Sequence, residues 1–368
     1  MKAPNIIIDS GAFSAWQGGS EINLKEYIAY CQRHVREMDV CVNLDYIPGE
    51  NGKMDHSQVA IENSASKSFQ NLKIMKSEGL SPMPVFHQGE RFYWLERMLE
   101  EGEQYIGIAP YKRDHPAQIT EWLDKCFTIL TNKKGMPLIK THGLGVTSCN
   151  QCIRFPWHSV DSTSWSIGGG MGSILVPQYY KDKPDYSKPP LTLRLSARKQ
   201  HSGPRGFDIL PAMQQDLVRK VANDYRIDMT ELRNTFMGRW KFNIQYYLGL
   251  AEACDGKLFK NHANSMFKSF APNGKGYEPK PIKLYLATLL HTNHHNEFLN
   301  AYDIKNRLLS YAFLKDLPDE FLQQYRETGL PEKKKPRPRK MSLKQLNSEA
   351  YRVKRAIALR DRLARPIE

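Results

Sequence analysis

Residues 6 to 16 read IIIDSGAFSAW, and this stretch sets the pattern for the first half of the chain. Three consecutive isoleucines predict a buried strand, because strands of a parallel sheet are apolar on both faces. Asp9, Ser10 and Gly11 follow this strand directly. A rigid strand would deliver the acidic side chain to the edge of the sheet, so the order of residues favours a functional role for Asp9.

Five further segments repeat this pattern of an apolar run that ends in polar residues or glycine: 39–48, 81–89, 104–110, 137–145 and 157–163. Helical patterns such as 23–38, 62–79 and 91–102 separate them. Six successive strand–helix units predict an α/β fold with a parallel sheet, and specifically a TIM (β/α)8 barrel. In such a barrel the strand ends share the face that carries the active site. We therefore expect a catalytic barrel over residues 1–177.

The second half of the chain differs in character. Residues 178–280 combine a linker rich in proline and lysine with a helical insert. The part 216–234 is a candidate helix–turn–helix for binding nucleic acid, but its aromatic and methionine content favours the packing face of the insert. The segment 281–330 contains strand-like runs at 283–289 and 307–314, which we expect to complete the barrel. The tail, 331–368, has the pattern of a basic amphipathic helix whose capping box joins Ser342 and Gln345.

Charge and composition limit the class of protein. The formal net charge is +14, and the tail supplies +9 of it from 13 basic and 4 acidic residues. A local excess of this kind favours a nucleic-acid partner over a merely solvated tail. Apolar runs are too short to span a membrane, the N-terminus does not resemble a signal peptide, and the 6 cysteines are scattered. We expect a cytoplasmic protein with reduced thiols and no membrane partner.

Short motifs in the first half resemble those of the tRNA-guanine transglycosylase superfamily, the queuine tRNA-ribosyltransferase type of enzyme. They are DSGAFSAW (9–16), NLDYIP (43–48), VFHQGE (85–90), YIGIAP (105–110), HGLG (142–145) and VDST (160–163). The CxCxxC zinc loop of the tRNA enzymes is missing, and SIGGGMGS (166–173) replaces their arginine segment. These departures resemble the phage-type branch, often called DpdA-type, which exchanges guanine in DNA for a 7-deazaguanine base such as preQ0. For a phage-encoded enzyme, the compartment would be the cytoplasm of the bacterial host.

The resemblance also implies an unusual order of the chain, because the family has two strands before the DSG motif. Here DSG lies at the N-terminus, and the segment 282–314 resembles the missing strands. We therefore expect a circularly permuted barrel, with 283–289 and 307–314 pairing beside the strand at 5–9.

The same resemblance implies a role for each site residue. Asp161 would attack C1′ and form a covalent aspartyl-nucleotide, and Asp9 would act as the general acid and base. The residues expected to bind the base are Ser10, Gly11, Asp45, Gln88, Gly89, Gly107, Ile108, Ala109, His142 and Gly143. Asp45 would accept hydrogen bonds from N1–H and the 2-amino group of guanine. Phe13 and Tyr46 are candidates for stacking on the base.

Simpler interpretations remain open for several of these residues. Asp45 has the pattern of a turn residue, His87 and His142 of structural histidines, and glycines 168–170 of either a phosphate cradle or a loop. No cofactor is expected; Cys149 and Cys152 form a CxxC, which leaves zinc as an alternative that lacks two ligands. The alternative functions are a tRNA-guanine transglycosylase, a non-catalytic nucleic-acid-binding protein on the same barrel, and a nucleoside hydrolase.

Overall fold

The computed structural model describes residues 6–36, 38–111, 114–196, 206–260, 276–277 and 282–286. The chain divides into two compact units, Met1–Lys315 and Asp316–Glu368, and every described residue belongs to the first. The predicted strand at 307–314 and the predicted basic helix at 331–368 therefore lie outside the described residues. Among the helices of the described residues, none is both long and apolar enough to cross a membrane.

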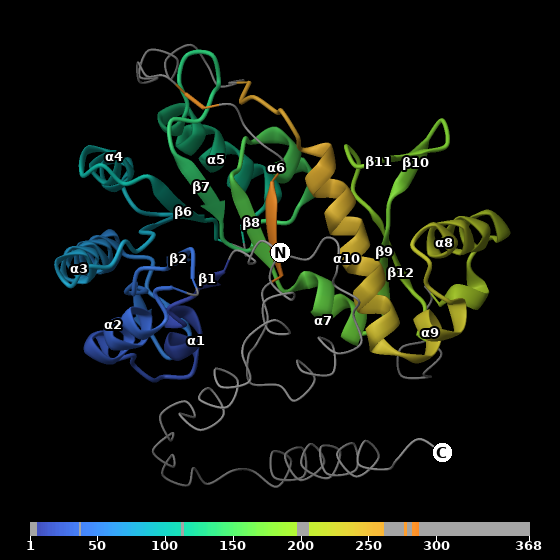
Figure 1. Ribbon diagram of the computed structural model, residues 1–368, viewed down its shortest axis with the longest axis horizontal. Helices are drawn as coiled ribbons and strands as arrows, with labels where there is room; N and C mark the ends of the chain where they lie inside the picture. Colours follow the sequence, from blue (N-terminus) through green and yellow to red (C-terminus); the bar gives the residue numbers. More distant parts are fainter. Residues whose placement is uncertain are drawn as a thin grey trace, which may run out of the picture. The chain divides into compact units, whose positions relative to one another are not determined.

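A parallel sheet runs through the first unit (Figure 1). Its five strands pair in the order β13, β8, β7, β6, β5, with bounds Lys283–Leu286, Ser159–Ser162, Lys140–Gly143, Tyr105–Ala109 and Val85–His87. A second parallel pair joins β1 (Ile7–Ile8) to β2 (Val40–Cys41). A parallel bridge between Val42 and Met83 connects this pair to the chain just before β5. The predicted α/β class and each of the six predicted strands are confirmed, although the strands are shorter than expected.

Helices alternate with these strands, as the apolar spacing predicts. They are α1 (Ala12–Gln17), α2 (Leu24–Arg33), α3 (Gln58–Ser77), α4 (Phe92–Glu100), α5 (Pro116–Leu130) and α6 (Cys149–Arg154). The hydroxyl of Ser57 caps α3 by accepting from the Ala60 N–H, and Gly79 follows its end with φ +81°. Only glycine adopts that backbone angle easily, so the predicted stop of this helix is confirmed. The apolar faces of α3, α4 and α5 pack into one core together with β5, β6 and β8.

A short hairpin between β2 and α3 was not predicted. It consists of β3 (Gly49–Glu50) and β4 (Lys53–Met54), and Asn51 and Gly52 connect the strands with φ of 51° and 74°. Two consecutive residues with positive φ form the turn that suits the twist of a hairpin, and Asn-Gly is its preferred sequence. The Asn-Gly pair is therefore a sequence signal for this hairpin.

The region after β8 leaves the parallel sheet earlier than expected. α7 (Ser164–Gly170) leads to β9 (Ser173–Val176), which pairs antiparallel with β12 (Leu191–Arg194). The predicted linker begins instead as a hairpin of β10 (Gln178–Tyr180) and β11 (Lys183–Asp185). Lys181 and Asp182 form its turn with φ of 48° and 63°. Aspartate is common in such turns but lysine is not, so the sequence gives only a weak signal for this hairpin.

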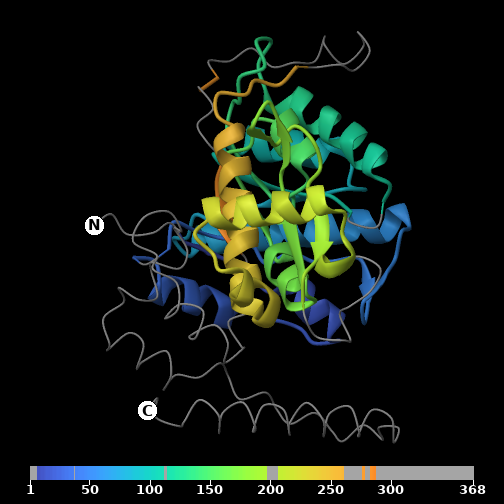
Figure 2. The same cartoon turned by 90° about the vertical axis from the view of Figure 1, so that its right-hand side faces the viewer.

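The predicted helical insert is confirmed, and its helices form a second core with these antiparallel strands. It comprises the 3-10 turn η2 (Phe207–Ile209), α8 (Ala212–Asp224), α9 (Met229–Asn234) and α10 (Phe236–Ala253). Figure 2 views the molecule from the side on which α8 and α9 lie. Apolar side chains of β9, β12, α8 and α9 pack with Phe242 of α10. Other side chains of α10, including Ile244 and Tyr247, pack into the main core, so this helix joins the two cores.

The pairing of β13 corrects one expectation. The segment 283–289 was expected beside the strand at 5–9, but β13 pairs in parallel with β8, with Lys283 opposite Ser159. The Lys283 N–H donates to the carbonyl of His158, which continues this ladder. After α10, which contacts both α6 and β13, the chain therefore extends the sheet at the β8 edge.

Candidate active site

Acidic and imidazole side chains gather at the carboxyl ends of the parallel strands. Asp9 follows β1, Asp45 follows β2, His87 ends β5, and Asp161 belongs to β8. Burial is the main cause that raises the pKa of Asp9, and the negative charge of Asp161 raises it further. The charge of Asp9 in turn raises the pKa of Asp45. The structure therefore brings the two predicted catalytic carboxyl groups and the predicted base-reading carboxyl group within electrostatic reach of one another.

Asp9 occupies a tight turn between β1 and α1. Burial of its carboxyl group raises the pKa, while hydrogen bonds from the backbone N–H groups of Gly11 and Ser10 oppose this rise. Asp9 as a whole residue is nevertheless exposed to solvent, although protein atoms surround its carboxyl group. Gly11 has φ +72° and is the N-cap residue of α1. The buried Ser10 hydroxyl accepts a hydrogen bond from the Ala12 N–H at 3.4 Å. Ser10 and Gly11 thus shape the turn that holds Asp9.

A chain of polar side chains reaches Asp161 from inside the sheet. The Asp161 Oδ1 atom accepts a hydrogen bond from the Gly145 N–H and lies 3.6 Å from His142 Nε2. On its other side, His142 Nδ1 hydrogen-bonds to the Ser159 hydroxyl at 2.6 Å, and Ser159 contacts the Tyr105 hydroxyl. Only 4% of the His142 side chain is exposed. Its contacts therefore make His142 a support for Asp161, in addition to the base-lining role predicted for it.

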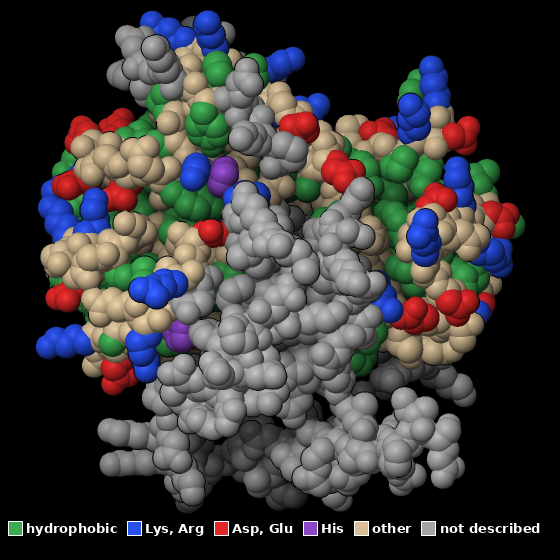
Figure 3. Space-filling view, viewed as in Figure 1, with side chains coloured by type: hydrophobic (Ala, Val, Ile, Leu, Met, Phe, Trp, Pro, Cys, Tyr) green, Lys and Arg blue, Asp and Glu red, His purple; other side chains and the backbone are tan. Residues whose placement is uncertain are grey.

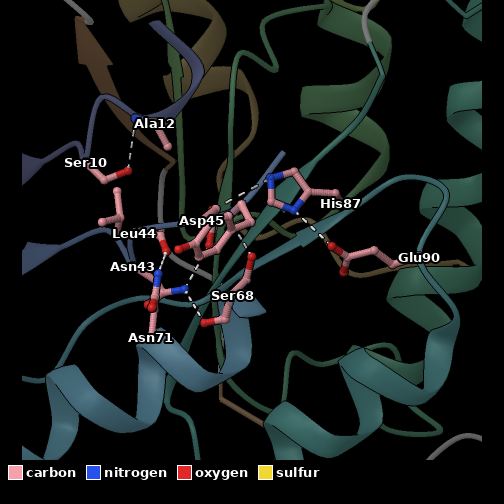
Figure 4. Close-up of polar contacts among 10 residues, drawn as sticks. Ser10, Ala12, Asn43, Leu44, Asp45, Ser68, Asn71, His87 and Glu90 are labelled. Atoms are coloured by element: carbon pink, nitrogen blue, oxygen red, sulfur yellow. Dashed lines mark hydrogen bonds and ion pairs between the residues drawn. The ribbon is translucent and has the colours of Figure 1, made fainter. Parts of the chain in front are cut away.

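Asp45 lies at the centre of a second polar cluster, which Figure 4 shows. Its Oδ1 accepts from the Asn43 side-chain amide at 2.9 Å, and its Oδ2 lies 3.7 Å from His87 Nε2. His87 Nδ1 lies 3.2 Å from Glu90 Oε1. Burial raises the pKa of Asp45 to about 7, although the positive charge of His87 and the Asn43 bond oppose the rise. This carboxyl group therefore titrates near neutral pH.

The position of Asp45 is fixed by the buried polar face of α3. The Asn43 side chain also donates to the Ser68 carbonyl at 2.9 Å, and the Ser68 hydroxyl accepts from the Tyr46 N–H at 2.8 Å. Asn71, one turn further along, donates to the Leu44 carbonyl at 2.7 Å. Because buried polar groups need partners, these bonds explain why amide and hydroxyl side chains interrupt an otherwise apolar helix face.

Gln88 and Gly89 belong to the loop after β5. The Gln88 side chain accepts from the Tyr111 N–H at 2.8 Å and donates to Asp114 at 2.6 Å. It therefore joins two neighbouring strand-end loops, and the predicted contact with a base would compete with these bonds. Gly89 has φ +104°, a region that favours glycine.

The predicted rim residues on β6 and β7 are engaged within the sheet. A Cβ atom on Gly107 would meet Leu144 Cδ1 at 2.8 Å, and one on Gly143 would meet Val146 Cβ at 2.9 Å. Ile108 is fully buried, and the Ala109 carbonyl accepts from the Gln88 N–H at 3.0 Å. The close packing of strands and their loops therefore accounts for the two glycines.

Exposed aromatic side chains flank the acidic residues. Phe13 of α1 is 59% exposed and Tyr46 is 46% exposed, with Lys67 Nζ 5.1 Å from the Tyr46 ring. Aromatic surfaces of this kind can stack on a base. On the face in Figure 3, basic and acidic side chains of the described part are interspersed and form no single basic patch. A separate depression lined by Arg154, Lys257 and Lys260 includes none of the strand-end residues.

Two other predicted features resolve differently. Glycines 168–170 belong to α7, and a Cβ atom on Gly169 would meet Trp240 Cδ1 at 2.5 Å, so close helix packing explains that glycine. Cys149 and Cys152 lie near Cys254, which is distant in sequence. Burial is the main cause that raises the pKa of Cys152, and the charges of Cys254 and Cys149 raise it further. Within the described ranges, no group of three or more His, Cys, Asp or Glu side chains is arranged to hold a metal ion.

Comparison with protein-family models, curated proteins and solved structures finds no match to this chain. The geometry at the strand ends is therefore the basis for a functional proposal. Sequence reasoning did not assign a role to Asn43, Glu90, Tyr105 or Ser159. Their common signal is a polar residue inside or directly after an apolar strand, which marks a buried partner of another polar group.

Proposed function

We propose that the protein is a DNA-guanine transglycosylase that exchanges guanine for a 7-deazaguanine base through a covalent aspartyl-nucleotide. The observation that supports this proposal is the electrostatic interaction of Asp9 with Asp161 at the strand ends, together with a weaker one between Asp9 and Asp45. Two carboxyl groups in unlike surroundings suit the two roles of this chemistry, since one must attack and the other must transfer a proton.

Asp161 is the proposed nucleophile. Its carboxylate forms a bond to C1′ while the C1′–N9 bond breaks, and the electron pair of that bond leaves with guanine. The contacts of Oδ1 with the Gly145 N–H and with His142 hold the carboxylate in one orientation. A fixed nucleophile that traps an oxocarbenium-like sugar divides one difficult step into two. The target nucleotide must be flipped out of the duplex for C1′ to be reached.

Asp9 is the proposed general acid and base. Its raised pKa favours the protonated form that donates a proton to the departing guanine. In the second half, the Asp9 carboxylate takes the proton from N9 of the incoming base, and N9 displaces Asp161 from C1′. Atoms and charges then return to their starting state, so the cycle requires neither a redox cofactor nor ATP.

The proposed fold is a circularly permuted TIM barrel. Its support is the parallel order β1, β2, β5, β6, β7, β8, β13, which follows the chain from start to end. Among the described strands, this is the order of a singly wound barrel in which one further strand would stand between β13 and β1. Residues 307–314 would occupy that place. The basic tail and the insert would bind the nucleic-acid backbone, in the cytoplasm, or in the cytoplasm of a bacterial host for a phage-encoded protein.

The test is mass spectrometry of nucleosides after incubation of the protein with a 7-deazaguanine base and either duplex DNA or tRNA. We expect the base in DNA. Incorporation only into tRNA would favour the tRNA enzyme, loss of guanine without replacement would indicate a nucleoside hydrolase, and no change in either polymer would indicate a non-catalytic binding protein.

The substitution Asp161→Asn tests the nucleophile. We expect it to abolish both exchange and the trapped covalent adduct, because an amide is a poor nucleophile, while DNA binding changes little. The matched control is Glu121→Gln, since the Glu121 side chain on α5 is 70% exposed, pairs with its helix neighbour Lys125 and lies outside the insert and the tail. Normal exchange by Asp161→Asn would show that another group attacks C1′.

A further inference from the structure

We propose that His87 and Glu90 are positioning residues that favour the carboxylate form of Asp45 over its protonated form and thereby select a guanine-type base over an adenine-type base. This inference rests on the proposed function and deepens it, because it concerns how the same site reads its base. From the sequence, His87 was open as either a site residue or a structural histidine, and Glu90 was given no role.

The geometry defines a linear array of charges. Glu90 Oε1 lies 3.2 Å from His87 Nδ1, and His87 Nε2 lies 3.7 Å from Asp45 Oδ2. The imidazole therefore meets a carboxylate on each side, an arrangement that favours the doubly protonated ring. Burial disfavours the charged ring, but the hydrogen bond and charge of Glu90 and the charge of Asp45 outweigh it and raise the pKa of His87 to about 9.

Glu90 has no evident structural reason to be acidic. Only 7% of its side chain is exposed, and its Oε2 is buried without a hydrogen-bond partner among the described residues. A buried unsatisfied carboxylate oxygen destabilises the fold. Its contact with His87 gives the negative charge a role, because that charge favours the protonated imidazole.

The protonated imidazole in turn acts on Asp45. The groups that face Asp45 are His87 from β5, Glu90 from the following loop, Asp9 after β1, and Asn43 from its own segment. From α3, the groups bonded to this segment are the uncharged Ser68 and Asn71. His87 is thus the cation of this array, and without it burial and two acidic neighbours would all favour protonated Asp45.

The protonation state of Asp45 determines which base edge fits. An ionised carboxylate offers two acceptors, which match the N1–H and 2-amino donors of guanine. A protonated carboxyl group offers one donor and one acceptor, which match N1 and the 6-amino group of adenine. Asp45→Asn also presents one donor and one acceptor at every pH, so it imitates the protonated state.

The experiment measures binding of radiolabelled guanine and adenine to the full chain by equilibrium dialysis between pH 5.5 and 9.5. For the wild type we expect guanine affinity to be constant above about pH 7 and to fall below it. In His87→Gln and Glu90→Gln the midpoint should move up by at least about one pH unit, which weakens guanine binding at pH 7 by at least about fivefold and restores it at high pH. Asp45→Asn should lose guanine preference at every pH, and Glu121→Gln, which changes an exposed glutamate of α5, should behave as the wild type.

The outcomes separate the two proposals. A wild-type protein that binds no guanine and exchanges none refutes the proposed function. A wild type that binds and exchanges guanine, together with an unmoved pH midpoint in His87→Gln and Glu90→Gln, refutes only the role of these residues. NMR of histidine-labelled wild type gives a measurement that needs no variant: an imidazolium signal for His87 that persists at pH 8 supports the proposal, and a neutral ring at pH 6.5 overturns it.

Discussion

The titration of Asp45 and His87 links the site to the stability of the protein. The pKa of Asp45 rises from 3.8 to about 7 on folding, chiefly through burial. The pKa of His87 rises from 6.5 to about 9, because Glu90 and Asp45 outweigh the opposing effect of burial. In both intervals the folded protein retains a proton that the unfolded chain has released. A rise in pH therefore favours the unfolded state.

From this sign we expect the free energy of unfolding to fall as the pH rises from about 4 to about 9. The two rises in pKa set an upper limit of about 8 kcal/mol for this fall, and the 28% exposure of the His87 side chain places the expected value below that limit. Urea denaturation at a series of pH values measures it. The double variant Asp45→Asn/His87→Gln should lose most of this dependence, whereas Asp216→Asn should keep it. A wild-type stability that rises over this range would contradict the assignment.

The helices α7 and α10 show how an element distant in sequence fixes the chain that follows Asp161. Arg239 donates to the Gly169 carbonyl at 2.7 Å, and the Trp240 indole donates to the Ser166 carbonyl at 2.7 Å. The Asn243 amide donates to the Trp165 carbonyl and its oxygen accepts from the Leu175 N–H. These bonds hold both ends of the α7 region against α10.

The neighbouring glycines of α7 provide a matched pair of substitutions. Gly169→Ala would place a Cβ atom 2.5 Å from Trp240, whereas nothing lies within 4 Å of a Cβ atom on Gly170. We expect Gly169→Ala to lower the free energy of unfolding by about 1–3 kcal/mol. Gly170→Ala should leave it unchanged or raise it by up to about 1 kcal/mol, because alanine favours a helix. Equal loss of DNA affinity in both variants, at unchanged stability, would instead indicate a phosphate cradle.

At the scale of the whole molecule, charge is divided unevenly between the described part and the tail. The tail at 331–368 carries +9 of the formal net charge of +14, and three of its lysines, 333 to 335, are consecutive. Counterion release makes the affinity of such a segment for DNA fall as salt rises, by about 0.9 in logarithmic slope for each phosphate contacted.

We therefore expect the triple substitution of Lys333, Lys334 and Lys335 by Gln to reduce the slope of log affinity against log salt by up to about 3. Fluorescence anisotropy with a DNA duplex measures the slope over a salt range of about 50 to 300 mM, which includes physiological ionic strength. Exchange of guanine at saturating DNA should persist, because none of the strand-end residues is changed. An unchanged slope would place the phosphate contacts elsewhere on the chain.

Local sequence patterns were sufficient to predict the strands and the acidic residues at their ends. An apolar run followed by Asp9 or Asp161 is a local signal, since hydrophobic spacing and strand-breaking polar residues act over a few positions. The same local logic located the helices of the insert. It failed at the hairpin of β10 and β11, because lysine, unlike aspartate, is not a usual residue at positive φ, and Lys181 occupies the first turn position.

Which polar side chains contact one another depends on how distant strands pair in the folded protein. Glu90, His87 and Asp45 form one array because the bridge between Val42 and Met83 brings β2 beside the start of β5. Tyr105, Ser159, His142 and Asp161 meet because β6, β7 and β8 are neighbours in the sheet. Strand pairing is a property of the assembled fold, and the pKa values near 7 and 9 follow from that pairing and from burial. The residue types allow such charges, but their contacts exist only once distant strands have come together.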